Sequence, residues 1–138
     1  MIVIDCSALV LALTAHSPDG ELIRSRVAEA GDIHAPTLLD YEIQSALLGM
    51  QRGGKLTEKE VERAVVAFRM LPIVKRETLP FWDRVKKLHA NLSAYDAQYV
   101  ALAEALGVPL VTSDARIKRS GAAKCEIEVF ASVRRDEA

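Results

Sequence analysis

Four of the nineteen acidic residues stand at positions that solubility alone does not explain: Asp5, Glu42, Asp96 and Asp114. Asp5 and Asp114 each follow a short apolar segment with the composition of a buried strand. Glu42 and Asp96 fall in the first turns of two segments whose apolar residues recur at helical spacing. Parallel strands end at one edge of a sheet and the helices that follow begin there, so the sequence predicts that all four acids share one rim.

Four carboxylates on one rim require a cation to hold them. Like charges about 4 Å apart repel by about 4 kcal/mol at an effective dielectric of 20. Carboxylate oxygens are the ligands that Mg²⁺ and Mn²⁺ prefer, and neither the cysteines nor the histidines have the spacing of zinc ligands. The pattern therefore predicts a site for one or two Mg²⁺ or Mn²⁺ ions.

Each acid also has a purely structural interpretation. Asp5 could cap the helix that follows it, and Asp114 could cap a turn. Asp96 lies three residues after Ser93 and could complete a capping box, while Glu42 could be an ordinary solvated helix residue. Each structural interpretation is sufficient for one acid taken alone. Only the convergence of all four acids on one rim favours a metal-binding role.

Short strands alternate with helices along the chain. Strands are predicted at residues 2–4, 33–35, 72–74, 109–112 and 127–129. Helices are predicted at residues 8–13 with Ser7 as the N-cap, 21–30, 38–52 with Thr37 as the N-cap, 58–69 after a capping box, 80–92 and 94–106. This alternation predicts an α/β fold of three layers, in which a mainly parallel central sheet carries helices on both faces.

Length and charge limit the classes of protein to consider. A chain of 138 residues fits one domain over residues 1–138, with residues 132–138 as a frayed charged tail. A net charge of −1 argues against a general electrostatic nucleic-acid binder, so any nucleic-acid site must be local. No apolar run approaches the roughly 20 residues that span a bilayer, and the first residues lack the basic start of a signal peptide. We therefore expect a cytoplasmic protein with no membrane partner.

Four segments together resemble a known family. They are the opening residues 3–9 (Val-Ile-Asp-Cys-Ser-Ala-Leu), the segment of residues 40–44 that contains Glu42, the long block of residues 93–107 and the short segment of residues 110–114. In order and separation these segments resemble the PIN-domain ribonucleases, and within them the VapC-type toxins of toxin–antitoxin pairs. The resemblance covers nearly the whole chain, and the block of residues 93–107 is its most specific part.

The resemblance implies roles for particular residues. Asp5, Glu42, Asp96 and Asp114 correspond to an acidic quartet that binds Mg²⁺ or Mn²⁺, with Ser7 and Thr112 as supporting hydroxyl residues. It implies a metal-dependent endoribonuclease that hydrolyses RNA with a metal-activated water. The basic residues just beyond the last acid could contact the RNA backbone or could equally form a solvated turn: Arg116, Lys118 and Arg119.

The resemblance also implies partners. It implies a cognate VapB-type antitoxin, whose C-terminal arm covers the active-site groove, an RNA substrate and a homodimer. Apolar stripes of the early helices are candidate dimer surfaces, although such residues are more often core: Leu11, Leu38, Leu47 and Met50. Aromatic residues make up only 5% of the chain, so the sequence shows no obvious platform for stacking RNA bases.

Two other functions compete with a nuclease. A catalytically silent PIN-like module would keep the fold but only bind protein or RNA, and the presence of all four acids argues against it. A phosphatase of similar topology would need a second acid near its nucleophilic aspartate, but Ser7 stands where the haloacid-dehalogenase type places that acid. We rank the nuclease first and the silent module second.

Overall fold

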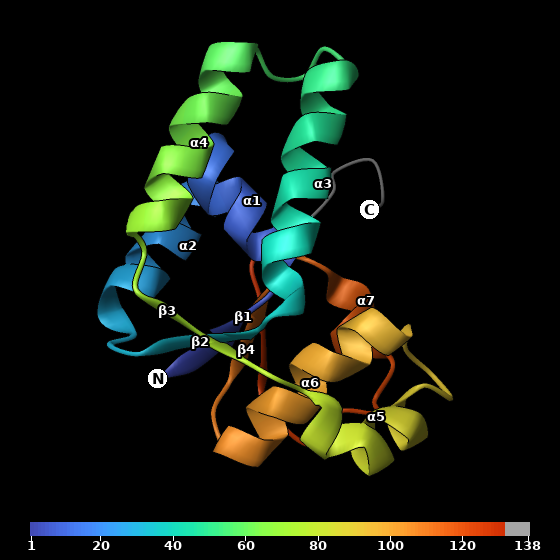
Figure 1. Cartoon of the computed structure of the whole chain (residues 1–138). Coiled ribbons are helices and arrows are strands. Elements are labelled where there is room, and N and C mark those ends of the chain that lie inside the picture. The colour runs from blue at the N-terminus through green and yellow to red at the C-terminus, as the bar shows by residue number, and fades with distance from the viewer. Residues whose placement is uncertain (132–138) are drawn as a thin grey trace, which may run out of the picture.

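Within residues 1–131, five short parallel strands form the centre of the fold in the order β3-β2-β1-β4-β5 (Figure 1). The computed structural model describes residues 1–131. Every ladder between the described strands is parallel, which confirms the predicted α/β fold with a parallel central sheet. The strands are β1 (Ile2–Ile4), β2 (Ile33–Pro36), β3 (Ile73–Arg76), β4 (Leu110–Thr112) and β5 (Ile127–Val129).

The chain reverses its direction across the sheet between β3 and β4. It first moves from β1 to β2 to β3, and then crosses back to place β4 on the other side of β1, with β5 outermost. Ile4 of β1 pairs with Val111 of β4, so the two central strands end side by side. In open α/β sheets such a switch point, at the carboxyl ends of the strands, is where ligands bind.

Helices cover both faces of the sheet. Right-handed crossovers place the helices between β1 and β3 on one face and those after β3 on the other, as Figure 1 shows. The helices of residues 1–131 are α1 (Cys6–Thr14), α2 (Pro18–Glu29), α3 (Leu38–Arg52), α4 (Glu58–Met70), α5 (Trp82–Leu88), α6 (Ala94–Leu106) and α7 (Ala115–Arg119), with a 3₁₀ turn η1 (Leu79–Phe81) before α5.

The core lies along the two central strands and α6. All residues of β1 and β4 are buried. Their continuous apolar sequences predicted this, because such sequences are typical of strands covered on both faces. Six residues of α6 are buried, among them every residue from Tyr99 to Ala103, so the middle of this helix is enclosed on all sides. It begins and ends where predicted, and Gly107 closes it in the left-handed conformation (φ 68°), which glycine adopts without strain.

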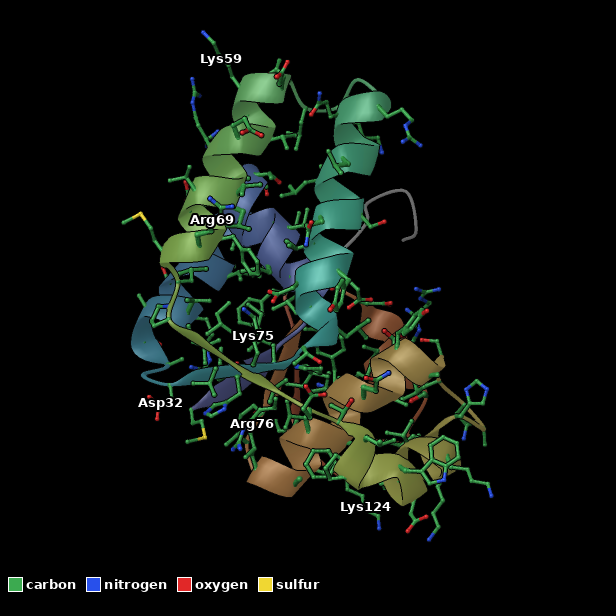
Figure 2. The ribbon with its side chains drawn as sticks, in the orientation of Figure 1. Asp32, Lys59, Arg69, Lys75, Arg76 and Lys124 are labelled. Atoms are coloured by element: carbon green, nitrogen blue, oxygen red, sulfur yellow. The ribbon has the colours of Figure 1, made fainter. Side chains whose placement is uncertain are left out.

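An edge strand was predicted at residues 72–74, and the structure forms β3 one residue later, at Ile73–Arg76, with Pro72 outside it. Lys75 and Arg76 extend from this strand (Figure 2), and charged side chains on an exposed edge discourage pairing with another chain. None of the helices within residues 1–131 is both long and apolar enough to cross a membrane. The tail predicted at residues 132–138 lies outside the described residues.

Several predicted helix ends were wrong. Asp5 caps α1 instead of Ser7, because the Ala8 amide donates to the Asp5 carboxylate, and α1 therefore begins at Cys6. Thr37 makes no side-chain capping bond, whereas the capping box of Thr57 is present as predicted. The helix after Pro80 ends at Leu88, well before residue 92, and α7 replaces a predicted turn.

Candidate active site

Asp5 stands at the switch point, directly after β1, and is 5% exposed. Both of its carboxylate oxygens accept hydrogen bonds. The Ser7 hydroxyl (2.7 Å) and the Ala8 amide (3.0 Å) donate to Oδ1, and the Thr112 hydroxyl donates to Oδ2 at 2.5 Å. A carboxylate can accept about four hydrogen bonds, so this network fixes the carboxylate and leaves room for one more ligand on Oδ2.

The two hydroxyl residues also connect Asp5 to the turn after β4. Their oxygens lie 3.2 Å apart, the Ser113 amide donates to the Ser7 hydroxyl at 3.0 Å, and the Asp114 amide donates to Thr112 Oγ1 at 2.9 Å. Ser7 and Thr112 thus hold the backbone that carries Asp114 against the carboxylate of Asp5. This contact gives a physical basis to the supporting role predicted for both.

Glu42 is positioned by a residue that the sequence analysis did not single out. Tyr99 of α6 donates its hydroxyl to Glu42 Oε1 at 2.5 Å, so it links α3 to α6. Tyr99 is almost fully buried, and burial raises the pKa of its phenol, so it stays a donor. One signal was available: Tyr99 follows Asp96 by three residues, which places both on one face of α6.

Asp96 lies on the first turn of α6, where its backbone amide donates to the Ser93 hydroxyl at 3.0 Å. The structural interpretation of this segment as a helix cap is therefore correct for Ser93. The Asp96 carboxylate also acts on its neighbours: burial is the main reason why the pKa values of Asp5 and Glu42 are raised, and the charge of Asp96 adds a smaller increase to both. The charge of Asp114 in turn raises the pKa of Asp96. Asp96 thus interacts electrostatically with each of the other three acids.

Three of the acids carry charge that the protein does not fully compensate. Burial raises the pKa of Asp5 to about 6, despite its hydrogen bonds. Burial is also the main reason why the pKa values of Glu42 and Asp96 lie above their ordinary values. Cys6 lies among these acids, where burial first and then the charges of Glu42 and Asp5 raise its pKa to about 12, so it remains a thiol.

Asp114 differs, because it already has a cationic partner. Arg116 forms a two-pronged ion pair with it (Nε to Oδ1 3.0 Å, Nη2 to Oδ2 2.7 Å), and this contact lowers the pKa of Asp114. The Arg116 side chain is 77% exposed, so the pair is open to solvent and to competitors. Lys118 and Arg119 are exposed on the same short helix, α7.

The donor set fits a hard divalent cation in its chemistry. It offers carboxylate oxygens with uncompensated charge, which favours Mg²⁺ or Mn²⁺. Within residues 1–131, however, no three His, Cys, Asp or Glu side chains already stand in metal-binding geometry. The four acids therefore do not form a closed ligand set in the described structure, and Asp114 is paired with Arg116.

Comparison with known proteins gives the family. The family model described as PIN domain matches residues 2–122. The chain is 41% identical over 129 residues to ribonuclease VapC9 of Mycobacterium tuberculosis, and the match covers 94% of this chain and 98% of that protein. The chain belongs to the PIN-domain family, in its VapC-type branch. This confirms the resemblance on which the site residues were predicted.

Solved structures show that this VapC-type chain also shares the fold. VapBC2 of Rickettsia felis, bound to a DNA fragment from its promoter, matches with a TM-score of 0.65 at 18% identity, covering 93% of this chain and 99% of that chain. VapC20 of Mycobacterium tuberculosis, described as a toxin that cleaves the sarcin–ricin loop, matches with a TM-score of 0.65 at 12% identity, covering 88% and 95%. The VapC-type chain therefore has the PIN-like fold predicted from its sequence.

Proposed function

We propose that this chain is a metal-dependent endoribonuclease and the toxin of a VapBC-type toxin–antitoxin pair, acting in the cytoplasm. The observation that carries the proposal is the group of four acids around Asp96, three of which have raised pKa values at the carboxyl edge of a parallel sheet. The relative VapC9, at 41% identity, is named a ribonuclease, which supports the same activity here.

In the proposed reaction the four acids bind a cation and orient a water. Asp5, Glu42, Asp96 and Asp114 would supply the oxygens for Mg²⁺ or Mn²⁺, as one or two ions. A bound ion supplies a Lewis acid for a phosphate oxygen and lowers the pKa of a water that attacks phosphorus. Ser7 and Thr112 keep the Asp5 carboxylate fixed, and Tyr99 does the same for Glu42. One of the four acids orients the attacking water as general base.

Basic residues next to Asp114 give RNA a place to bind. Arg116, Lys118 and Arg119 are exposed on α7, beside acids that on their own would repel phosphate. Arg116 pairs with Asp114, and its exposed guanidinium is a candidate partner for a phosphate of the RNA backbone. Contacts of this kind weaken as salt concentration rises.

The protein partners are proposed by analogy with the family. The fold relative VapBC2 is a pair of proteins that binds its own promoter, and by analogy a VapB-type antitoxin would cover the acids of this chain with its C-terminal arm. We also propose a homodimer. Of the four apolar residues suggested for its surface, Leu47 is buried in the core, whereas Leu11, Leu38 and Met50 are only partly buried and keep some exposed surface.

Cleavage of a pool of end-labelled cellular RNAs tests the activity. We expect discrete cuts with Mg²⁺ or Mn²⁺ and none with EDTA. Asp96→Asn removes the charge at the centre of the group and should lower the cleavage rate at least a hundredfold. Asp83→Asn, which changes an exposed acid of α5, is the matched control and should keep full activity.

Two results would contradict the proposal. Cuts that persist in Asp96→Asn would show that the activity comes from another protein in the preparation. RNA binding without any cleavage, unchanged by Asp5→Asn and independent of metal, would identify the chain as a silent PIN-like binding module.

A further inference from the structure

Aromatic residues are few in this chain, but each of its three tyrosines contacts or adjoins an acid of the candidate active site. Tyr99 is buried and donates to Glu42. Tyr41 directly precedes Glu42 in α3, and Tyr95 directly precedes Asp96 in α6. The low aromatic content of the sequence predicted no platform for stacking bases, whereas the fold brings these tyrosines to one site from two helices.

The rings of Tyr41 and Tyr95 are open to solvent. Tyr41 is 71% exposed and Tyr95 is 59% exposed, and neither belongs to the hydrophobic core. Neither hydroxyl forms a hydrogen bond with another residue of the described part of the chain. Single exposed aromatic residues are common on protein surfaces. These two differ because each stands beside an acid of the same site, so both rings are available to a ligand of that site.

Both side chains leave their helices toward the rim that carries the acids. Tyr41 is the fourth residue of α3 and Tyr95 is the second residue of α6. The two helices begin at the carboxyl edge of the sheet, and Cα–Cβ bonds tilt toward the N-terminus of a helix. The bond from the Tyr99 hydroxyl to Glu42, at 2.5 Å, holds this part of α3 beside α6 (Figure 1). The two exposed rings therefore flank one site.

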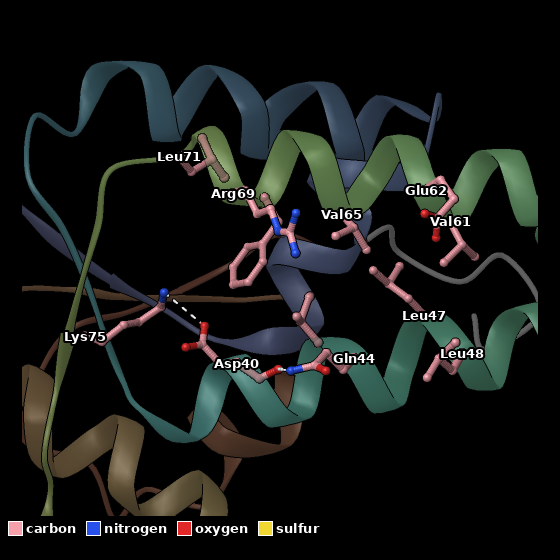
Figure 3. Close-up of a pocket in the computed structure, with 12 residues that line it drawn as sticks. Asp40, Gln44, Leu47, Leu48, Val61, Glu62, Val65, Arg69, Leu71 and Lys75 are labelled. Carbon is pink, nitrogen blue, oxygen red and sulfur yellow. Dashed lines mark hydrogen bonds and ion pairs between the residues drawn. The ribbon is translucent and has the colours of Figure 1, made fainter.

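The charge on the other side of Tyr41 is already compensated. Asp40, which precedes Tyr41, pairs with Lys75 of β3 at 3.0 Å (Figure 3). Lys75 also lies 5.0 Å from the centre of the Phe68 ring. Asp40 therefore contributes little repulsion to a polyanion that lies against the Tyr41 ring, and the uncompensated acids are those that a cation would bind.

We propose that Tyr41 and Tyr95 stack on two unpaired bases of the RNA, one on each side of the phosphate that is cleaved. Stacking on exposed aromatic rings is the usual way in which proteins hold unpaired bases, while cationic groups hold the backbone. Here the acids with their cation and the basic residues of α7 would take the phosphates, and the two rings would take the bases. The inference rests on the proposed nuclease and names two residues that position its substrate.

The arrangement selects against duplex RNA. Bases in a duplex are stacked on one another, so neither face of a base is free for a tyrosine ring. Stacking on a ring requires little hydrogen bonding to base edges and therefore tolerates any base. The two tyrosines thus select unpaired RNA at the cut and leave the choice of sequence to other contacts.

Fluorescence anisotropy with three labelled probes tests the stacking. The probes are a single-stranded RNA of mixed sequence, the same strand annealed to its complement, and an abasic strand that keeps only the ribose–phosphate backbone. Ca²⁺ replaces Mg²⁺, and a gel checks that the RNA stays intact. The native chain should bind the single strand about tenfold more tightly than either other probe. Tyr41→Ala and Tyr95→Ala should each weaken that binding about fivefold or more and leave binding of the abasic strand unchanged.

Conservative variants show whether the ring itself binds. Tyr41→Phe and Tyr95→Phe keep the ring and should bind the single strand as the native chain does. Met70→Ala is the matched control, since it removes a side chain that is 78% exposed at the end of α4, near the start of β3 and the opposite edge of the sheet. It should not change the binding of any probe. Circular dichroism should show that every variant is folded.

Three results would overturn the stacking. They are a native chain that binds all three probes equally, an alanine variant that binds the single strand as tightly as the native chain, and a phenylalanine variant that binds as weakly as its alanine counterpart. RNA cleavage in Mg²⁺ reports separately on the nuclease. A native chain that binds the single strand through both rings but never cuts RNA would keep the stacking and contradict the proposed function. Unchanged cleavage and unchanged KM in both alanine variants would do the reverse.

Discussion

At the scale of single residues, burial and hydrogen bonding have opposite effects on the pKa of Asp5. The carboxylate is almost fully buried, and burial raises its pKa to about 6 from an ordinary value of 3.8. Hydrogen bonds from Thr112, Ala8 and Ser7 act in the opposite direction and only partly compensate. The residue is thus held rigidly in a place where its charge is unfavourable, which is the state that a bound cation would relieve.

This imbalance predicts a dependence of stability on pH in the metal-free protein. Because the folded-state pKa is raised, the folded chain keeps a proton that the unfolded chain releases, so stability falls as pH rises from about 4 through 6. The loss from Asp5 is roughly 3 kcal/mol, at 1.36 kcal/mol per pKa unit. Asp5→Asn removes this contribution, so in EDTA it should be more stable than the native chain at pH 7.5 and not at pH 4.

Urea unfolding of both proteins over that pH range measures the difference. Taking the difference cancels the titration of the carboxyl groups that do not interact with Asp5. If the free energy of unfolding changed with pH in the same way for both proteins, the Asp5 carboxylate would be ionised in the folded chain without cost. That result would contradict the effect expected from its burial.

At the scale of elements, the site depends on how closely α1 and α2 approach each other. Gly20 lies at the start of α2, where a Cβ atom would come 2.5 Å from the Ala15 carbonyl oxygen and 2.9 Å from that of Leu11. Only a residue without a side chain fits there. Since α1 begins at the acid of the site, its position is set partly by this contact.

Two glycine substitutions should therefore have opposite effects. Gly20→Ala forces α2 away from backbone atoms that cannot move independently, and should destabilise the fold by about 1–3 kcal/mol. Gly49→Ala is the control in α3, where nothing lies within 4 Å of the added methyl group. It should stabilise the fold by about 0.5–1 kcal/mol through helix propensity. Chemical denaturation measures both, and a neutral Gly20→Ala would contradict the close approach of the two helices.

At the scale of the whole molecule, metal binding should stabilise the fold. The four acids come from the end of β1, from α3, from α6 and from the turn after β4, so an ion that holds them connects distant parts of the chain. An ion at a hundredfold excess over its Kd adds about 2.7 kcal/mol to the free energy of unfolding. We expect Mn²⁺ or Mg²⁺ to raise the Tm by several degrees.

A thermal melt with and without the ion provides the measurement, independently of any RNA. Asp96→Asn should lose most of the rise in Tm, whereas Asp83→Asn should keep it. An equal rise in both variants would show that the ion binds elsewhere.

Much of the architecture could be predicted because it depends on short-range patterns. The bounds of α6 follow from Ser93 before the helix and Gly107 after it, and the capping box of α4 is a four-residue signal. Helix α7 was missed, since five residues are too few to show a helical period. Ser7 was mistaken for the cap of α1 because both it and Asp5 are good capping residues, and only the fold shows which one accepts the Ala8 amide.

The sequence by itself determined the kind of chemistry: four acids placed after apolar strands or near the starts of helices, in a pattern typical of one family. Glu42 was predicted in a first helical turn, but it is the fifth residue of α3 and lies in the second turn. The tertiary structure decided how those acids behave. The order β3-β2-β1-β4-β5 sets β1 beside β4, so that Thr112 reaches Asp5 across 107 positions of chain, and Tyr99 reaches Glu42 across 57. Burial, hydrogen bonding and mutual repulsion shift the pKa values only after these distant residues meet, and spacing along a chain carries no information about such contacts.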